Sequence, residues 1–321
     1  MDTRGPLGDT GDDAARPRPS LARTLATSRR RAMQSSALTA IFLPVALGII
    51  MLGLGLSLTL ADFKRVVVYP RAVLVGLLCQ MLVLPAVCYG LAVGFGLAPE
   101  LAVGLMLLAA SPGGATANLF SHLAKGDVAL NITLTAVNSL LSLLTLPFIV
   151  NFALTAFMGE GKVLPLQFDK IVQVFAIVLV PVSIGMTIRA FAPAAADRLD
   201  KPVRILSAVF LILIVAATII KERAIIVDSF ASVGPAALCF NLASLLVGYS
   251  IPRLLSLDQR QSIAIGMEIG IHNGTLAIAI ATAPTLLNNS VMAIPPAIYS
   301  LIMFFTAAAF GVLVNRGRRD D

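Results

Sequence analysis

The segment SPGGATAN, at residues 111–118, interrupts an apolar run that extends from residue 100 to residue 123. A second segment, GMEIGIHNGT at residues 266–275, interrupts the apolar run 259–282 in the same way. Proline inside a helix removes a backbone donor, and glycine weakens a helix. The sequence therefore predicts that each run forms a discontinuous helix with irregular backbone near its middle.

The overall composition predicts that these runs lie in lipid. Of the 321 residues, 58% are hydrophobic and 13% are charged, and the mean hydropathy is +0.91. A soluble domain has about 45–50% apolar and about 25% charged residues, so an aqueous fold could not bury this much apolar surface. Because runs of about 20 apolar residues cross a bilayer as helices, we predict an all-α polytopic membrane protein in the lipid bilayer. It has about nine transmembrane helices, at residues 37–60, 72–95, 100–123, 128–152, 168–191, 203–220, 225–249, 259–282 and 291–314.

The chain is predicted to have three parts: a polar N-terminal tail at 1–36, a transmembrane domain at 37–314 and a C-terminal tail at 315–321. The N-terminal tail has no apolar segment of the kind found in secretory signal peptides, and its polar composition predicts disorder. Its later arginines and serines resemble a transit peptide, whereas its early aspartates do not fit that alternative.

The positive residues indicate an orientation in the membrane. The net charge is +7, and most Lys and Arg of the transmembrane domain lie in short connections on one predicted side. This placement is typical of orientation signals and argues against nucleic-acid binding. The positive-inside rule predicts a multi-pass protein of the cell (inner) membrane with its C-terminus in the cytoplasm. Nine spans would leave the arginine-rich tail outside, against the same rule. Either the tail is tolerated there, or an extra element near residues 20–36 touches the membrane.

Glu268 is the carboxylate in the interior of an apolar run, inside the second interrupted segment. An acidic residue at that depth costs about 2.5–3.5 kcal/mol on insertion scales, so it is kept for a cation, a proton pathway or a counter-ion. The structural alternative is a glutamate that reaches the interface from near a helix end. One carboxylate with several neutral oxygens suits a monovalent cation such as sodium, because hard cations prefer oxygen ligands. The neutral oxygens are predicted to come from Gln80, Asn118, Asn131, Thr135 and Asn273.

Each of these polar residues also has a purely structural interpretation. Interhelical hydrogen bonds in membranes are worth about 0.6 kcal/mol on average, and we favour that role for Asn138 and Ser139. Asn118 and Asn273 stand beside the interruptions, which favours a functional role. His272 can be a neutral cation ligand, a substrate donor or a titratable proton carrier, and a hydrogen-bonded core histidine is the structural alternative.

The two interruptions are also predicted to present helix N-termini near the membrane midplane. Backbone N–H groups that follow Gly114 and Gly274 would carry partial positive charge. Such helix ends suit the carboxylate or sulfonate of an anionic substrate. Broken helices at matching places in two halves further predict an inverted-repeat transporter. The predicted substrate-binding residues are Gly114, Ala115, Thr116, Asn273 and Gly274.

Three stretches carry a resemblance to a known family. They are SPGGATANLFSHLAKGDVALNITLT at 111–135, EIGIHNGTLA at 268–277 and LGIIMLGLGLSL at 47–58, together with Gln80. From about residue 42 to residue 314 the chain resembles the bile acid:sodium symporter family. This resemblance implies a panel domain and a core domain, with two unwound helices that cross near the midplane. Bacterial members commonly have ten helices, and this chain resembles the arrangement that lacks the first.

The resemblance also implies two sodium sites. The first uses the positions of Ala117, Asn118, Asn131, Thr135 and Glu268. The second uses the positions of Gln80, Glu268, Ile269, Ile271 and His272, partly through backbone carbonyls. Three residues depart from the family pattern: Ala117 and Asn131 stand where serine is common, and His272 stands where glutamine is common. We therefore expect one or two coupled sodium ions, with or without a proton.

These features together predict a secondary active transporter: sodium-coupled symport of an organic anion by alternating access. An apolar wall of Tyr299, Met303 and Phe304 permits a bile-acid-like substrate or a small carboxylate. Proton-coupled or sodium-independent anion transport through Glu268 and His272 is the alternative, and a membrane sensor is a further one. An enzyme is not expected, because the sequence offers no paired acid and base or metal cluster at membrane depth. The oligomeric state is left open.

Overall fold

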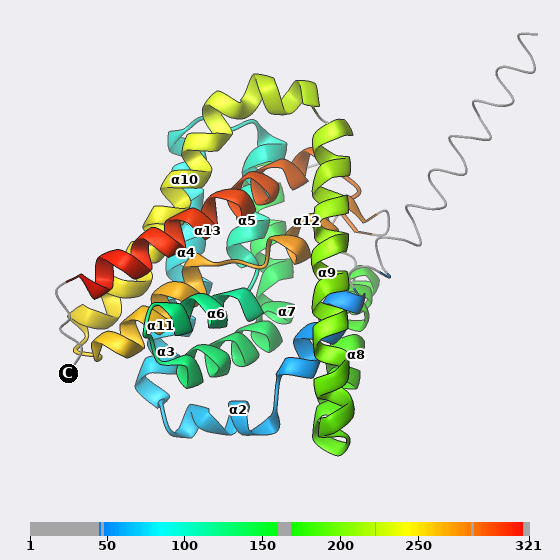
Figure 1. Cartoon of the computed structure of the whole chain (residues 1–321). Coiled ribbons are helices and arrows are strands. Elements are labelled where there is room, and N and C mark those ends of the chain that lie inside the picture. Colours follow the sequence, from blue (N-terminus) through cyan, green and yellow to red (C-terminus); the bar gives the residue numbers. More distant parts are fainter. Residues whose placement is uncertain (1–44, 46–47, 160–167, 222, 284–285, 317–321) are drawn as a thin grey trace, which may run out of the picture. The chain divides into compact units, whose positions relative to one another are not determined.

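The structure is a computed structural model that describes residues 45, 48–159, 168–221, 223–283 and 286–316 (Figure 1). The chain divides into two units, Met1–Phe42 and Leu43–Asp321, and every described residue belongs to the second. The predicted tail at 1–36, and residues 317–321 of the predicted C-terminal tail, lie outside the described residues. The described part is helical, and its isolated extended pairing joins Gly113 to His272.

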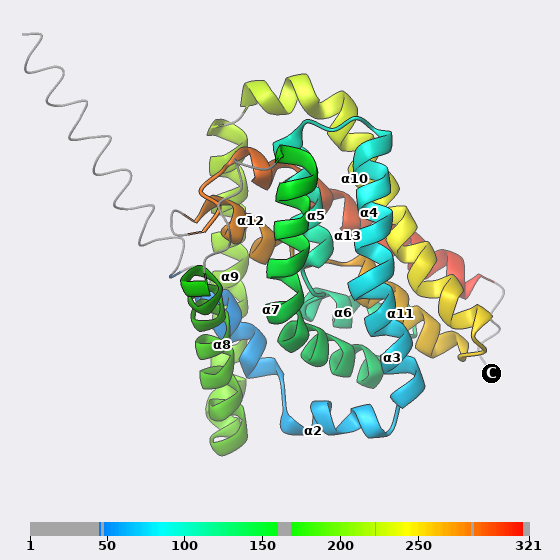
Figure 2. The same ribbon diagram turned by 180° about the vertical axis from the view of Figure 1, so that it is seen from behind.

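The helices follow one another through short connections, as Figures 1 and 2 show from opposite sides. A helix at Gly48–Ser57 precedes short α2 and the 3-10 turn η1, and a π-helical turn η2 joins α3 to α4. The elements are α2 (Leu60–Lys64), η1 (Arg65–Val67), α3 (Pro70–Leu78), η2 (Cys79–Val83), α4 (Leu84–Gly94), α5 (Pro99–Ala110), α6 (Ala115–Leu123), α7 (Val128–Met158), α8 (Phe168–Phe191), α9 (Pro193–Lys221), α10 (Arg223–Leu254), α11 (Gln259–Gly270), α12 (Gly274–Thr282), η3 (Val291–Ala293) and α13 (Ile294–Asn315).

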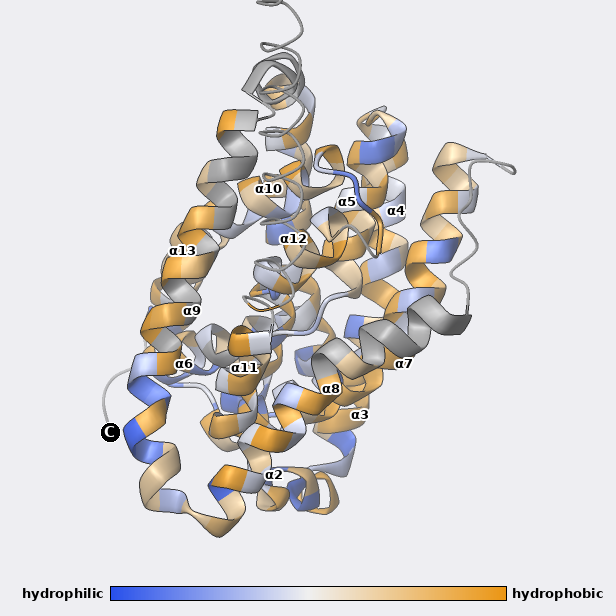
Figure 3. Ribbon diagram, turned by 90° about the vertical axis from the view of Figure 1, so that its right-hand side faces the viewer, coloured by the Kyte–Doolittle hydropathy of each residue, from blue (hydrophilic) through white to orange (hydrophobic). Residues whose placement is uncertain are grey.

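The helices have the length and composition of membrane spans. Within the described residues, four continuous helical stretches are long and apolar enough to cross a bilayer: Pro70–Gly94, Val128–Met158, Phe230–Leu254 and Val291–Asn315. Shorter apolar helices lie at Gly48–Ser57, Pro99–Ala110 and Leu179–Phe191, and Figure 3 shows hydrophobic residues along most of the helices. The chain is thus a multi-pass, all-α membrane protein, and its total of about nine spans stays a prediction.

Both predicted interruptions are present, and both are shorter than the sequence suggested. In the first, helix α5 ends at Ala110 and α6 begins at Ala115. In the second, only residues 271–273 leave the helix, so the expectation of irregular backbone from Gly266 onward is wrong. Gly266 and Gly270 are helical, and they let α10 pack closely. A Cβ on Gly270 would lie 2.4 Å from Leu245 Cδ2.

The two non-helical segments meet at one point. Gly113 and His272 form an antiparallel bridge, and the Asn273 N–H donates to the Pro112 carbonyl at 2.8 Å. Around this crossing, α11 packs against α6 and α7, while α12 packs against α5 and α13. A backbone group freed by one broken helix is therefore satisfied by the other, as burial in an apolar medium requires.

A second close packing involves the helix Gly48–Ser57 and α8. A Cβ on Gly55 would lie 2.2 Å from the Val182 carbonyl oxygen, and one on Gly185 would lie 2.6 Å from the Leu52 carbonyl oxygen. Small residues that bring two backbones together in this way are typical of membrane helix pairs. The Arg189 Nε also donates to the Leu56 carbonyl at 2.6 Å. These contacts couple α8 to the first described helix.

Candidate functional site

Glu268 lies on α11, two residues before that helix ends, and its side chain is fully buried. The Thr135 hydroxyl donates to its Oε2 at 2.6 Å, whereas Oε1 has no hydrogen-bond partner. Gly113 approaches the carboxylate so closely that a Cβ there would lie 2.6 Å from both oxygens. Within the described residues Glu268 forms no ion pair. A buried carboxylate in this setting requires a compensating cation or a proton.

Helix α7 directs a row of polar side chains to this carboxylate. Asn131, Thr135 and Asn138 are spaced by four and three residues, so they share one face of the helix. Asn131 is fully buried, and its Nδ2 donates to the Ala264 carbonyl at 2.6 Å while its Oδ1 has no partner. On α6, Asn118 places its Oδ1 3.4 Å from the Thr135 hydroxyl. The structure thus brings Asn118, Asn131, Thr135 and Glu268 together.

Gln80 and His272 converge on the carbonyl of Ser111, on the other side of the crossing. Gln80, in the π-helical turn η2, donates its Nε2 to the Ala109 and Ser111 carbonyls, both at 3.1 Å. His272 Nδ1 lies 3.0 Å from the Ser111 carbonyl oxygen. Because a carbonyl only accepts, Nδ1 carries the proton and Nε2 is an acceptor. Gln80 Oε1 and His272 Nε2 are both buried without a partner.

The backbone positions Ile269 and Ile271 lie at the end of α11. In a continuous helix the Asn273 N–H would bond to the Ile269 carbonyl, but it bonds to Pro112 instead. Ile271 has already left the helix, with φ −114° and ψ 87°. The break therefore diverts a donor from Ile269 and places both residues beside His272.

The two helix N-termini at the crossing differ. Helix α6 begins after Gly114, which has no side chain to cap it, so the N–H groups of its first turn lack a side-chain acceptor there. Helix α12 begins after Asn273, whose Oδ1 accepts from the Leu276 N–H at 3.0 Å. Gly274 is needed for packing, because a Cβ there would lie 1.9 Å from Ser300 Oγ. Of the predicted anion-binding ends, the one formed by residues 114–116 is therefore the more open.

Two polar residues have other surroundings than the sequence suggested. Ser139 bonds within its own helix, to the Thr135 carbonyl at 2.6 Å, rather than between helices. Asn138 faces the Glu268 carboxylate, and neither atom of its buried amide makes a hydrogen bond of ordinary geometry. The interhelical role expected for Asn138 is therefore not observed. Its spacing from Asn131 and Thr135 was the signal that could have placed it at the site.

The apolar wall expected on α13 is also revised. Tyr299 is fully buried, and its hydroxyl donates to the Gly270 carbonyl at 2.9 Å, so it does not line an open surface. Asn241 on α10, which the sequence analysis missed, donates to the same carbonyl at 2.9 Å. Met303 is buried as well, while Phe304 is partly exposed and stacks against Phe120 with ring centroids 6.1 Å apart.

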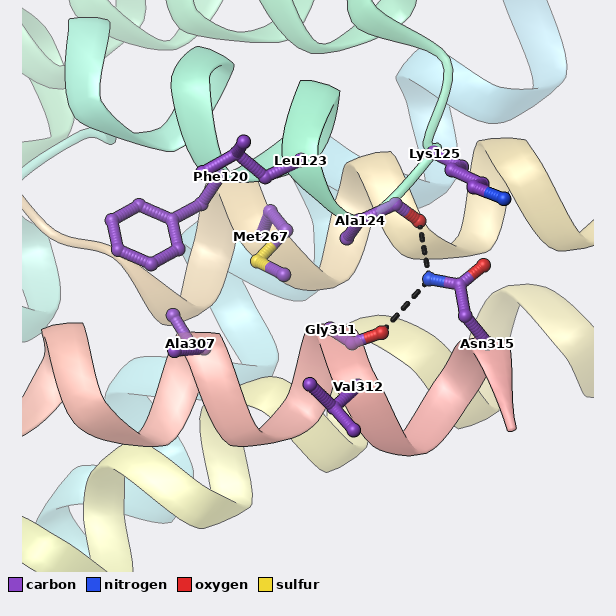
Figure 4. Close-up of a pocket in the computed structure, with 10 residues that line it drawn as sticks. Phe120, Leu123, Ala124, Lys125, Met267, Ala307, Gly311, Val312 and Asn315 are labelled. Carbon is purple, nitrogen blue, oxygen red and sulfur yellow. Dashed lines mark hydrogen bonds between the residues drawn. The ribbon is translucent and has the colours of Figure 1, made fainter.

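A groove of about 330 Å³ lies between α6, α11 and α13 (Figure 4). Phe120, Met267 and Gly311 belong to its apolar walls, and Lys125 and Asn315 lie at its polar end. Asn315 holds that end together, because its Nδ2 donates to the Ala124 and Gly311 carbonyls, both at 2.8 Å. Met267 precedes Glu268 in α11, so the groove reaches the helix that carries the buried carboxylate.

Among the residues that the structure describes, no three His, Cys, Asp or Glu side chains form a metal-binding group. The donors at the crossing are one carboxylate, several neutral oxygens and one imidazole nitrogen. A divalent ion would be expected to recruit more acidic ligands. The donor set instead fits a hard monovalent cation.

Discontinuous helices that meet at a buried polar site in a multi-pass helical protein are typical of secondary transporters. A family model described as the sodium bile acid symporter family matches residues 44–229. The chain belongs to this family, and the family resemblance noted in its sequence is confirmed.

Curated relatives support the same class. The chain is 30% identical over 261 residues to an uncharacterized sodium-dependent transporter, YocS, of Bacillus subtilis, with 81% of this chain and 78% of that protein covered. It is 26% identical over 273 residues to the human ileal sodium/bile acid cotransporter, with coverage of 84% and 77%. It is also 26% identical over 276 residues to a probable chloroplastic sodium/metabolite cotransporter, BASS2, of rice, covering 85% of this chain but only 64% of that protein. The family and these relatives are transporters and not enzymes, as the sequence predicted.

Proposed function

We propose that the protein couples sodium to the symport of a small organic anion across the cell (inner) membrane. The observation that carries this proposal is the set of buried, unpartnered oxygens around Glu268 at the helix crossing. Leaving such acceptors without a donor costs about 1–3 kcal/mol each. A sodium ion would satisfy several of them at once and would balance the charge of the carboxylate.

The first proposed sodium position lies between α6, α7 and α11. Glu268 Oε1 and Asn131 Oδ1 are unpartnered oxygens at this position, and Thr135 and Asn118 lie beside them. Ala117 is fully buried at this place and offers no side-chain oxygen. Asn131 is the longer side chain in a position where the family commonly has serine, so an amide oxygen replaces a hydroxyl.

A second position lies between η2 and the end of α11. Gln80 Oε1 is free there, and the carbonyls of Ile269 and Ile271 belong to the backbone that leaves the helix. The remaining donor is His272 Nε2, a nitrogen, which sodium binds less well than oxygen. We therefore propose one sodium ion in the first position and a weaker second one here.

The anion is proposed to bind at the N-terminus of α6. The N–H groups after Gly114, in residues Ala115 and Thr116, carry the partial charge of the helix end. Asn273 and Gly274 lie across the crossing, and the Asn273 amide nitrogen is not used in its helix cap. Relatives are named as bile acid or metabolite cotransporters. A bile-acid-like anion or a small carboxylate is therefore the proposed substrate class.

Alternating access is proposed to use two domains. The order of a long helical stretch, a broken helix and a second long helix occurs twice, once in residues 70–158 and once in residues 223–315. This order supports an inverted repeat that forms the core domain. The closely packed pair of Gly48–Ser57 and α8, with α9, is the proposed panel domain. Rocking of one domain against the other would expose the crossing to either side, with the C-terminus in the cytoplasm.

The proposal is tested by uptake into proteoliposomes of radiolabelled taurocholate and pyruvate, which represent the two anion classes, with and without a sodium gradient. We expect Glu268→Ala and Asn118→Ala to abolish sodium-dependent uptake. The matched controls are Glu100→Ala, in the first turn of α5, and Asn151→Ala, an exposed residue of α7; both should transport as the wild type does. Normal uptake by both site variants under an imposed sodium gradient would show that the site assignment is wrong.

Proton coupling is the second candidate, and one observation favours it. His272 Nε2 is a buried acceptor without a partner, beside the unwound end of the helix that carries Glu268. An imidazole nitrogen of this kind can accept a proton or face a cation. Uptake that is independent of sodium and driven by an imposed pH gradient would select this function.

A further inference from the structure

Asn138 is a buried polar residue for which the proposed ion positions provide no role. Its side chain is 1% exposed, and both its Oδ1 and its Nδ2 lack hydrogen-bond partners. A buried amide can make up to four hydrogen bonds. Asn138 therefore leaves more of its hydrogen-bonding capacity unused than the other unpartnered residues at the crossing, each of which has one unpartnered atom. An unsatisfied amide of this kind requires an explanation, either as strain or as a ligand-binding group.

The position of Asn138 directs its amide into the site. It lies one turn beyond Thr135 on the face of α7 that also carries Asn131. Thr135 already donates to Glu268 Oε2, and the amide of Asn138 faces the same carboxylate. The other carboxylate oxygen, Oε1, is also without a partner. Unpartnered polar atoms of α7 and α11, the Asn138 amide and Glu268 Oε1, therefore lie at the same site.

We propose that Asn138 is a sodium ligand of the first ion position. Its Oδ1 coordinates the ion, and its Nδ2 is left to donate to the Glu268 carboxylate. The side chain supplies the neutral oxygen that Ala117, fully buried on α6, cannot supply. This role rests on the proposed sodium coupling and extends it by one ligand. The same arrangement satisfies both ends of the amide and also Glu268 Oε1.

The substitution Asn138→Leu distinguishes two interpretations of Asn138, as a sodium ligand or as a buried residue that merely lacks hydrogen-bond partners. Leucine has the same branched outline of the side chain as asparagine and has no polar atoms. Replacing an unpaired buried polar group by an apolar one of similar shape is neutral or stabilising. If Asn138 has no ligand, Asn138→Leu should therefore unfold at the same or a higher temperature and keep its response to sodium. If Asn138 binds sodium, the variant should stay folded and need much more sodium for the same response.

The experiment measures thermal unfolding of the purified full chain in detergent, titrated with NaCl at constant total salt made up with KCl. Binding of ²²Na⁺ to the same samples gives the affinity directly. We expect Asn138→Leu to raise the sodium concentration for half-maximal stabilisation at least tenfold. Asn138→Ala is the second variant, with a smaller side chain for the same loss, in case leucine prevents folding. Asn151→Leu, at an exposed position of the same helix, is the matched control and should respond as the wild type does.

The outcomes distinguish this proposal from the proposed function. A wild-type response to sodium that Asn138→Leu and Asn138→Ala share overturns the role of Asn138 and leaves sodium coupling intact. A wild type that responds equally to sodium and potassium overturns both. A response that needs at least tenfold more sodium in the Asn138 variants, with Asn151→Leu unchanged, establishes Asn138 as part of the ion site.

Discussion

The two helix breaks at the crossing both free backbone groups that must find hydrogen-bond partners, but they carry different side chains. The first, at residues 111–114, consists of serine, proline and two glycines and brings no charge to the site. The second, at residues 271–273, begins three residues after Glu268 and contains His272 and the capping residue Asn273. The first break thus provides space and backbone groups, whereas the second provides the groups that can bind or titrate.

The freed carbonyls sharpen this contrast. Ser111 O accepts from Gln80 and His272, and Gly270 O accepts from Asn241 and Tyr299. Each carbonyl therefore has two side-chain donors, one of them from the long helical stretch that precedes the broken helix. The two pairs of donors differ in whether the remaining polar atoms of their side chains have hydrogen-bond partners.

Around Gly270 the remaining polar group is used, because the Thr306 hydroxyl contacts Asn241 Oδ1. Around Ser111 both remaining acceptors, Gln80 Oε1 and His272 Nε2, are unpartnered. Satisfied networks stabilise a fold, whereas buried groups left open mark places for a ligand. The donors around Gly270 therefore form a satisfied, structural network, whereas those around Ser111 keep two acceptors that the proposed second ion position would use.

The largest effect is expected from filling the space at the first break. In Gly113→Ala the new Cβ would lie 2.6 Å from both oxygens of Glu268, so the carboxylate must move. We expect sodium-dependent uptake to fall by about 100-fold, the scale of ångström-sized misplacements in a site. Sodium should also cease to raise the unfolding temperature.

The matched control for that substitution is Gly90→Ala on α4, where no atom lies within 4 Å of the new Cβ. It should keep both uptake and the sodium response. Equal losses in Gly113→Ala and Gly90→Ala would mean that the close approach to Glu268 has no part in ion binding, and the contrast between the two breaks would lose its basis.

A smaller effect is expected from His272→Gln, which tests the open acceptor of the second break. Glutamine offers an amide oxygen where the imidazole offers Nε2, and it does not titrate. We expect the sodium concentration for half-maximal uptake to fall roughly fivefold, which corresponds to about 1 kcal/mol. Any pH dependence of uptake that comes from His272 should disappear, because glutamine does not titrate.

His122→Gln is the control, because His122 is exposed near the end of α6. It should leave both curves as they are in the wild type. If His272→Gln also changes neither curve, His272 has no role in coupling, and its role is structural: the hydrogen bond to the Ser111 carbonyl and the stacking against Phe240, at 5.6 Å between centroids.

The sequence predicted the features that depend on local chemistry. Pro112 and the glycines beside it indicate a break in the helix, and a glutamate inside an apolar run indicates a functional site. The sequence did not indicate where each break ends, because Gly266 and Gly270 serve helix packing, which depends on α10. Nor did it show that Tyr299 is buried or that Asn138 has no partner. Those properties arise from the neighbouring helices and not from the segment itself.

The smallest effect is expected where the comparison assigns a purely structural role. Tyr299→Phe removes one of the two donors to the Gly270 carbonyl and leaves the Asn241 bond in place. Since one donor remains, we expect a loss of about 1 kcal/mol of stability, seen as a lower unfolding temperature in detergent. The sodium response and uptake should be unchanged. Tyr89→Phe, on α4 among Phe152 and Phe157, is the matched control.

Gln80→Leu removes the corresponding donor to Ser111 together with a free acceptor, so it should reduce sodium affinity as well as stability. If Tyr299→Phe weakens sodium binding as much as Gln80→Leu does, the two carbonyls are functionally alike, and the division between a structural donor network at Gly270 and an ion-binding one at Ser111 is wrong.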